Sequence, residues 1–446
     1  MYSAISDTTE RRRQVLQYER AAIVLLVCLL FAFIYPFYLA ISGIDTSVPA
    51  ALQTENKTIY YLQDVIPTLC VGIALLYRRS TFLLRLSPPL LLYCAFGFLS
   101  ALWSEDPYVS LKFAVRLSLY IGAIAALCEL LKLETRCRVL MMMFAFVILA
   151  SVAMAVLIPS YGTHQATDAA QSIHTGLWRG VFPHKNELGA MASNSTIAFL
   201  FFGRLGPSFP GLRFLCLGAS IACLIFAGSA GAIASLLVVL ILYFAIFVTW
   251  RWPLAFTWLF VFAVAAALAG ALLATDSESF ALLGRDTTLS GRTSIWDVVL
   301  AMIADSPLIG HGYYAGTSAF AGPRLRELFG PAIWDAHNGY LTLLLETGVI
   351  GLFLYLYAVL SVVLMGTAQA KREPRERRDC LMLLLISPIL SLVFAFFEGH
   401  PVGEEGCIGT LNFFSLVTTY SYLKQSESTR EVAHEWEAGR DVGVRI

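Results

Sequence analysis

This sequence of 446 residues has few charged side chains, and that scarcity excludes several classes of protein. Asp, Glu, Lys and Arg make up 14% of it and hydrophobic types 58%, whereas soluble domains are roughly 25% charged. Lys+Arg and Asp+Glu both number 31, so there is no net charge that would attract nucleic acid. A soluble globular enzyme, a disordered scaffold and a nucleic-acid-binding module are therefore excluded.

Several short motifs are also missing from the sequence. The nine cysteines form no CxxC pair and most lie in apolar runs, so we expect core cysteines rather than disulfides or a zinc site. A Walker motif and a GxGxxG fingerprint are absent, so no nucleotide energy source is implied, and GxSxG is absent as well. We expect no cleavable signal peptide, because the first apolar run, at residues 21–42, is too long for one.

Long apolar runs are what the sequence has in abundance. A transmembrane helix takes about 20 apolar residues, whereas a membrane β-barrel would alternate polar and apolar residues. We therefore predict an all-α, polytopic membrane protein with about twelve transmembrane helices. The predicted spans are residues 21–42, 59–77, 87–103, 108–131, 139–158, 187–203, 214–228, 230–250, 254–274, 338–364, 381–397 and 409–423.

The distribution of Lys and Arg predicts how these spans are oriented. An even number of spans places both termini on one side, and most Lys and Arg residues then fall on that side, which identifies it as cytoplasmic. We predict one membrane-embedded domain over residues 1–446, with a cytoplasmic tail at 424–446. The two larger outer loops would be 160–186 and 275–337.

The longer outer loop has helical patterning of its own. Ser294-Ile-Trp-Asp297 fits a capping box at the start of a short amphipathic helix. We expect this helix to lie on the membrane surface or, alternatively, to pack on the transmembrane bundle, and to end near 307–310. A second short helix is expected at 323–329. The apolar stripe of the first helix is Ile295, Val298, Val299, Met302 and Ile303.

Two cations lie inside a predicted membrane span, where charged side chains are unfavourable. Lys112 and Arg116 lie four residues apart in the predicted span 108–131, so they share one helix face. A cation within a span costs about 2.5–3.5 kcal/mol, so we expect an anionic partner. That partner is an internal carboxylate, the outer lipid headgroups, or the phosphate of a lipid-linked substrate.

Further cations lie in the outer loops. Arginine is the planar donor that suits phosphate oxygens, and Arg292 lies near a predicted helix start, where backbone amides also favour anions. The alternative for each of these cations is attraction to anionic headgroups, which we favour for Arg324 and Arg326. The remaining candidates in the outer loops are Arg179, Lys185, Arg285 and Arg292.

One histidine stands where the long outer loop enters span 338–364. His337 lies in Asp335-Ala-His-Asn-Gly-Tyr340, and an imidazole at a helix start can act as a base near neutral pH. A lone histidine is more often structural, but the flanking Asp335 and Asn338 and the cationic loop favour catalysis.

A divalent cation could be held by Glu398, His400 and Glu404, which are close in sequence. No stronger metal signature accompanies them, so we interpret this segment as a solvated outer loop and predict no metal.

Three segments have an order and spacing that occur together in one known family. They are Trp103-Ser-Glu-Asp-Pro107 with the basic span after it, Arg179-Gly-Val-Phe-Pro-His-Lys-Asn186, and Gly291-Arg292 with Trp296, followed by His337-Asn-Gly-Tyr-Leu341 and Glu346-Thr-Gly-Val-Ile-Gly351. In these segments, which together span most of the chain, the sequence resembles the bacterial O-antigen ligase family and the related Wzy-type polymerases. One position departs: the family often has an arginine just after the serine between spans 214–228 and 230–250, where this chain has Ala230.

The resemblance implies a glycosyltransferase of the bacterial inner membrane, with cytoplasmic termini and an active site facing the periplasm. The donor would be O-antigen on undecaprenyl diphosphate and the acceptor a hydroxyl of lipid A–core, surrounded by membrane lipids. We expect an inverting single displacement without metal or cofactor, because no acidic nucleophile accompanies His337 and cations can stabilise the leaving diphosphate. His337 would be the base; Arg292, Arg285, Lys112, Arg116 and Arg179 would bind the diphosphate; Asn338, Asp335, Lys185 and Asn186 would support them.

Three other functions remain open from the sequence. A Wzy-type polymerase of O-antigen or exopolysaccharide would need two lipid-diphosphate sites, and the cations could form one cluster or two. A protein O-glycosyltransferase resembles the same family but often carries an extra outer domain. A transporter of lipid-linked glycan would suit twelve spans, but transporters often show repeated halves and paired interrupted spans, which we do not find here.

Overall fold

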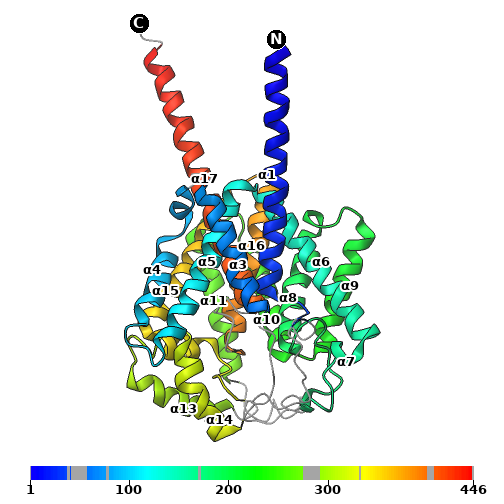
Figure 1. The fold of residues 1–446 in the computed structure, drawn as a ribbon, viewed down its shortest axis with the longest axis vertical. Helices are drawn as coiled ribbons and strands as arrows, with labels where there is room; N and C mark the ends of the chain where they lie inside the picture. Colours follow the sequence, from blue (N-terminus) through cyan, green and yellow to red (C-terminus); the bar gives the residue numbers. More distant parts are fainter. Residues whose placement is uncertain are drawn as a thin grey trace.

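The computed structural model describes residues 2–37, 41, 58–76, 80–168, 172–274, 292–330, 333–398 and 406–443. In these residues the chain forms a bundle of helices (Figure 1), and its β-structure is one antiparallel bridge between Thr163 and Trp178. The all-α prediction is confirmed. The longer helices are α1 (Tyr2–Ile34), α3 (Thr58–Leu76), α4 (Pro88–Ser100), α5 (Pro107–Leu130), α6 (Leu133–Leu157), α8 (Lys185–Phe202), α9 (Pro210–Ala227), α10 (Ala230–Val248), α11 (Leu254–Ala274), α13 (Arg292–Asp305), α15 (Gly339–Ala370), α16 (Arg375–Phe394) and α17 (Cys407–Gly443). The shorter ones are η2 (Ser80–Arg85), α7 (Pro159–Gly162), η3 (Ser172–His174), η4 (Gly203–Leu205), η6 (Gly316–Ala321) and α14 (Gly322–Phe329).

Each of the twelve predicted spans coincides with one of the longer helices, and α13 is the helix left over. Within the described residues, six of these helices are long and apolar enough to cross a membrane: α1 from Gln17 onward, α5, α6, α9, α10 and α15. Shorter apolar helices lie at Tyr60–Leu76, Pro88–Ser100 and Leu254–Val264. The chain is therefore a polytopic membrane protein.

The two terminal helices extend from the same end of the bundle (Figure 1), whereas α13 and α14 lie at the opposite end. This arrangement agrees with the predicted even number of crossings. It also places α13 and α14, two described helices of the long loop, at the end away from the termini.

The middle of the bundle contains helices that are less apolar but well buried. In α8, Asn194 accepts a hydrogen bond from the hydroxyl of Ser387 in α16, at 2.8 Å. In α17, the amide of Asn412 donates to the hydroxyl of Tyr355 in α15, at 2.9 Å. Such hydrogen bonds between helices allow α8, α15, α16 and α17 to carry polar side chains inside a membrane bundle.

A kink in α15 anchors the long loop to the bundle. At Gly348 the backbone has φ 62° and ψ −168°, and a Cβ there would lie 2.3 Å from the carbonyl carbon of Leu308. Glycine is required at this close approach. The kink leaves backbone amides of α15 free to bond the loop. The amide of Val349, for example, donates to the carbonyl of Pro307 at 2.9 Å. This is the structural role of the segment Glu346-Thr-Gly-Val-Ile-Gly351.

The segment Trp103-Ser-Glu-Asp-Pro107 holds the same loop from the other side. The indole of Trp103 donates to the carbonyl of Ile309 at 3.3 Å, and the amide of Glu105 donates to the carbonyl of His311 at 3.3 Å. Two of the three motifs that carry the family resemblance thus form the scaffold of the long loop.

The α13–α14 unit has a small core of its own. The predicted stripe is buried where α13 meets α14 and α15, against Leu325 and Leu345 among others. Its apolar face therefore packs on protein, which supports the alternative that the helix packs on the bundle. The predicted capping box is also wrong, because α13 already includes Arg292 and so Ser294 lies inside the helix. The second short helix is confirmed as α14.

Candidate active site at the start of helix α15

His337 sits in a tight, strained turn just before α15. The side chain of Asn338 caps the helix by accepting the amides of Tyr340 and Leu341 at 3.0 and 3.2 Å. Asp335 accepts the backbone amide of His337 at 3.1 Å, and this turn holds His337 at φ 46°. A positive φ is uncommon outside glycine, and such residues often occur at functional sites.

Arg292, the first described residue of α13, lies against this turn. Its Nη1 donates to the carbonyl of Phe397 at 2.7 Å and lies 3.5 Å from the carbonyl of His337. The indole of Trp296, one turn further along α13, donates to the carbonyl of Ala336 at 2.9 Å. The predicted base and one of the predicted diphosphate ligands are thus held together by backbone contacts.

Glu398 completes the cluster, and it was considered from the sequence only as a weak metal ligand. Its Oε2 lies 3.8 Å from Nδ1 of His337, and its Oε1 lies 3.8 Å from Nη2 of Arg292. The same Oε1 accepts a hydrogen bond from the side-chain amide of Asn186, at the start of α8. We call His337, Arg292, Glu398 and Asn186 the outer cluster. No sequence pattern links Glu398 to residues so distant in the chain, so it could not be found that way.

The carboxylates of the outer cluster set the protonation of His337. Burial by itself lowers the pKa of this imidazole, but the contact with Glu398 and the charges of Asp335 and Glu398 outweigh burial and Arg292, so the pKa is raised above its usual value. The side chains of His337, Arg292 and Glu398 are 27%, 24% and 22% exposed. The site is partly shielded, yet a substrate can reach it.

Four helices of the described chain begin around residues 395–398. The amide of Gly339 in α15 donates to the carbonyl of Ala395 at 2.7 Å, and α8 and α13 approach through Asn186 and Arg292. In α10, a Cβ on Gly231 would lie 2.7 Å from the Cβ of Phe397. Helix N-termini carry partial positive charge. Their convergence makes this a favourable place for an anion.

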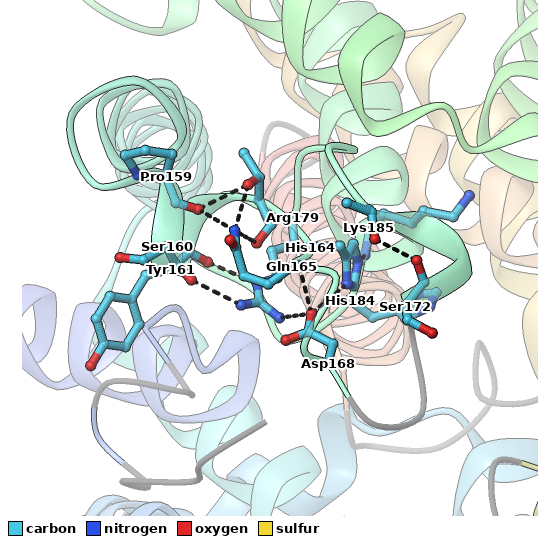
Figure 2. A network of polar contacts seen from close by, with 12 residues as sticks. Pro159, Ser160, Tyr161, His164, Gln165, Asp168, Ser172, Arg179, His184 and Lys185 are labelled. Atoms are coloured by element: carbon cyan, nitrogen blue, oxygen red, sulfur yellow. Dashed lines mark hydrogen bonds and ion pairs between the residues drawn. The ribbon is translucent and has the colours of Figure 1, made fainter. Parts of the chain in front are cut away.

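The first outer loop is held by Arg179, whose donors are used within the loop (Figure 2). Its Nη1 pairs with Asp168 at 3.0 Å, and its Nε donates to the carbonyl of Tyr161 at 2.8 Å. The guanidinium is 2% exposed. These contacts assign Arg179 to holding the loop in shape, and its predicted contact with the diphosphate stays a prediction.

Lys185 begins α8 beside the outer cluster. Its side chain is buried, and its Nζ lies 3.2 Å from the carbonyl of Gly228, the residue before the Ser229–Ala230 turn. The structure therefore brings a cation to the turn at which the family often carries an arginine and this chain has alanine.

Lys112 and Arg116 face α3 instead. Arg116 is buried, and its Nε pairs with Asp64 at 2.9 Å. Lys112 lies over the rings of Tyr60 and Phe113, with Nζ 5.8 and 5.2 Å from their centroids. Arg116 thus has an internal carboxylate as a partner, one of the alternatives that the sequence left open.

The structure thus brings together His337, Arg292, Asp335, Asn338 and Asn186 among the predicted site residues, with Lys185 next to them. Arg285 lies outside the described residues, as do His400 and Glu404. In the described part of the chain, no group of three or more His, Cys, Asp or Glu side chains is arranged to hold a metal ion.

Comparison with known proteins shows two similarities. Over 366 residues the chain is 27% identical to ExoQ, an exopolysaccharide production protein of Rhizobium meliloti (strain 1021), which covers 78% of this chain and 80% of ExoQ. A family model described as O-antigen ligase matches residues 215–356, a stretch that includes both Arg292 and His337. The resemblance drawn from the sequence is confirmed by these two matches, since residues 215–356 are similar to the O-antigen ligase model.

Proposed function

We propose that this protein is a glycosyltransferase that moves a glycan from a lipid diphosphate to a hydroxyl group of a second glycan. The observation that carries the proposal is the contact of Arg292 and Glu398 with the turn of His337. It places a cation and a base side by side, and α13, which supplies the cation, lies at the end of the bundle opposite the termini (Figure 1).

The chemistry requires a stabilised leaving group. As the bond between the anomeric carbon and the diphosphate oxygen breaks, negative charge grows on the diphosphate. Preorganised positive charge stabilises the transition state most at such a point. Here Arg292 supplies a full charge, and the nearby helix starts add partial positive charge. Lys185 lies close enough to contribute, and Lys112, Arg116, Arg179 and Arg285 remain proposed ligands of the diphosphate.

The acceptor hydroxyl must lose its proton as its oxygen attacks the anomeric carbon. Nδ1 of His337 faces Asp335 and Glu398, at 3.3 and 3.8 Å, which leaves Nε2 to take that proton. With no covalent intermediate, a single displacement inverts the configuration at the anomeric carbon. The raised pKa makes His337 a stronger base, at the cost of a larger protonated fraction at neutral pH.

For the substrates, we propose that the donor is O-antigen on undecaprenyl diphosphate and the acceptor lipid A–core, which would make the protein an O-antigen ligase. It would lie in the bacterial inner membrane with cytoplasmic termini and its outer cluster facing the periplasm. The O-antigen ligase model over residues 215–356 supports this proposal.

The similarity to ExoQ favours a second candidate, polymerisation of an exopolysaccharide, because it extends over most of both chains. In that reaction the acceptor is another lipid-linked glycan, so a second diphosphate would have to be bound. Lys112, which is exposed on the separate α3–α5 surface, is the cation available for it, and Arg116 lies beside it, paired with Asp64.

The two candidates separate in one experiment. Purified protein is given a defined glycan on undecaprenyl diphosphate, with and without lipid A–core, and the products are sized on a gel. A product that requires lipid A–core identifies a ligase. A longer lipid-linked glycan without lipid A–core identifies a polymerase. If neither product forms and the donor stays intact, both proposals are contradicted.

A further inference from the structure

Three histidines gather around the start of α8 (Figure 2 labels two of them). The ring centroids of His164, His174 and His184 lie 5.4–5.6 Å from one another. They come from the loop after α7, from η3, and from the residue just before α8. None of the three belongs to the outer cluster, and the chemistry proposed above gives them no role.

Two of these imidazoles accept hydrogen bonds from the first amides of α8. Nδ1 of His184 accepts the amide of Asn186 at 3.1 Å, and Nε2 of His164 accepts the amide of Lys185 at 3.2 Å. The first amides of a helix need such acceptors, and Ser, Thr, Asp or Asn usually supply them. Here imidazole nitrogens do so, and an imidazole nitrogen can accept a hydrogen bond only when it is unprotonated.

The surroundings keep both rings neutral. Burial comes first in lowering the pKa of His184 well below its usual value, and His164, His174, Lys185 and His337 lower it further. For His164, burial and the charge of Arg179 outweigh Asp168 and lower the pKa to about 4. At neutral pH the cap of α8 is therefore intact.

The capped helix start connects directly to the outer cluster. Asn186 is fixed by its backbone amide to His184, while its side-chain amide donates to Oε1 of Glu398. The other oxygen of Glu398 faces Nδ1 of His337 at 3.8 Å. A chain of contacts thus runs from the histidines through Asn186 to the carboxylate that orients the proposed base.

We infer that His184 and Asn186 are positioning residues for glycan transfer: His184 caps α8, the cap fixes Asn186, and Asn186 holds Glu398 against His337. This inference rests on the proposed function, since it assigns the two residues to the reaction of His337. Neither residue touches the reacting atoms in this account. Their effect is exerted through the carboxylate.

Asn186→Ala tests this, with Asn194→Ala as the matched control. Both substitutions remove a hydrogen-bonded side-chain amide from α8, but Asn194 bonds Ser387 two turns away from the outer cluster. The readout is the pH profile of kcat/KM, together with kcat and KM measured separately. In Asn186→Ala, Glu398 loses its anchor, so we expect kcat to fall about tenfold with KM little changed, and the acid limb to move to lower pH.

A second pair of variants keeps the inference testable if Asn186→Ala does not fold. His184→Asn supplies another acceptor for the helix start and should retain most of the activity, whereas His184→Ala should lose activity and shift the acid limb as Asn186→Ala does. The inference is overturned if Asn186→Ala keeps the wild-type acid limb, if Asn194→Ala shifts it equally, or if the two His184 variants behave alike. Absence of transfer by the wild-type protein would instead overturn the proposed function.

Discussion

Arg292 and His337 are separated by 45 residues in the chain, yet Nη1 of the arginine lies 3.5 Å from the carbonyl oxygen of the histidine. The same nitrogen donates to Phe397, next to Glu398. A cation, a base and a carboxylate are therefore gathered where α8, α10, α13 and α15 begin. That gathering is the structural basis of the proposed transfer reaction.

Replacement of His337 by alanine should abolish transfer, because no other described side chain takes its place beside Glu398. Loss of a positioned general base typically costs about 10²–10⁴-fold in rate, which a radiolabelled-glycan transfer assay can resolve. His311→Gln is the control, because His311 bonds the carbonyl of Met302 and stacks on Phe320, away from the outer cluster. Substantial residual transfer by His337→Ala would remove His337 as the base.

Arg292→Ala should weaken use of the donor. Hydrogen bonds to charged groups are worth about 1.5–3 kcal/mol, so we expect the KM for the lipid diphosphate to rise about tenfold or more. Arg292→Lys should also be impaired, because an ammonium lacks the planar set of donors. Arg324→Ala, in α14, should match the wild type. Unchanged donor kinetics in Arg292→Ala would place the diphosphate elsewhere.

The pH dependence of transfer should follow the protonation of His337. The base is active when neutral and its pKa is raised, so the rate should increase with pH through a midpoint above the usual 6.5 of histidine. Glu398→Gln removes a charge that contributes to the raised pKa of His337, so the midpoint should move to lower pH. An unchanged midpoint in this variant would show that Glu398 does not act on His337.

The histidines of the first outer loop should make that loop sensitive to acid. His164 titrates near pH 4 when folded and near 6.5 when unfolded, so the unfolded form binds more protons between these values. Its contribution to loop stability is complete above 6.5 and is lost as the pH falls towards 4. Hydrogen exchange of residues 160–168 and 172–186 should show this loss, and His164→Gln should reduce it. If hydrogen exchange of this loop depended on pH equally in the wild type and in His164→Gln, His164 would not be the source of the acid sensitivity.

Much of the fold could be predicted from the sequence, because long apolar runs determine where membrane helices form. The predicted start of α13 was wrong because Ser294-Ile-Trp-Asp297 resembles a helix cap. The helix already includes Arg292, which contacts the carbonyls of Phe397 and His337. For the apolar face of α13 the sequence left two alternatives open, the membrane surface and the bundle, and its packing against α14 and α15 supports the second. An amphipathic stripe shows that a face is buried but not what buries it.

The candidate site was only partly predictable. His337 and Arg292 stood out because histidine and arginine are conspicuous in an apolar chain. The acidic partners did not stand out, since Glu398 lies 212 residues from Asn186 and Asp64 lies 52 residues from Arg116. Such pairings depend on how the helices pack. The spacing of residues in the sequence therefore does not predict these pairings.

The central claim is that this protein transfers a glycan from a lipid diphosphate with His337 as the base. Its most direct test measures the release of undecaprenyl diphosphate together with the glycan product, in wild-type and His337→Ala protein. The account predicts equimolar lipid diphosphate and product from the wild type and neither from the variant. A donor left intact by the wild type, or equal release by both proteins, would contradict it.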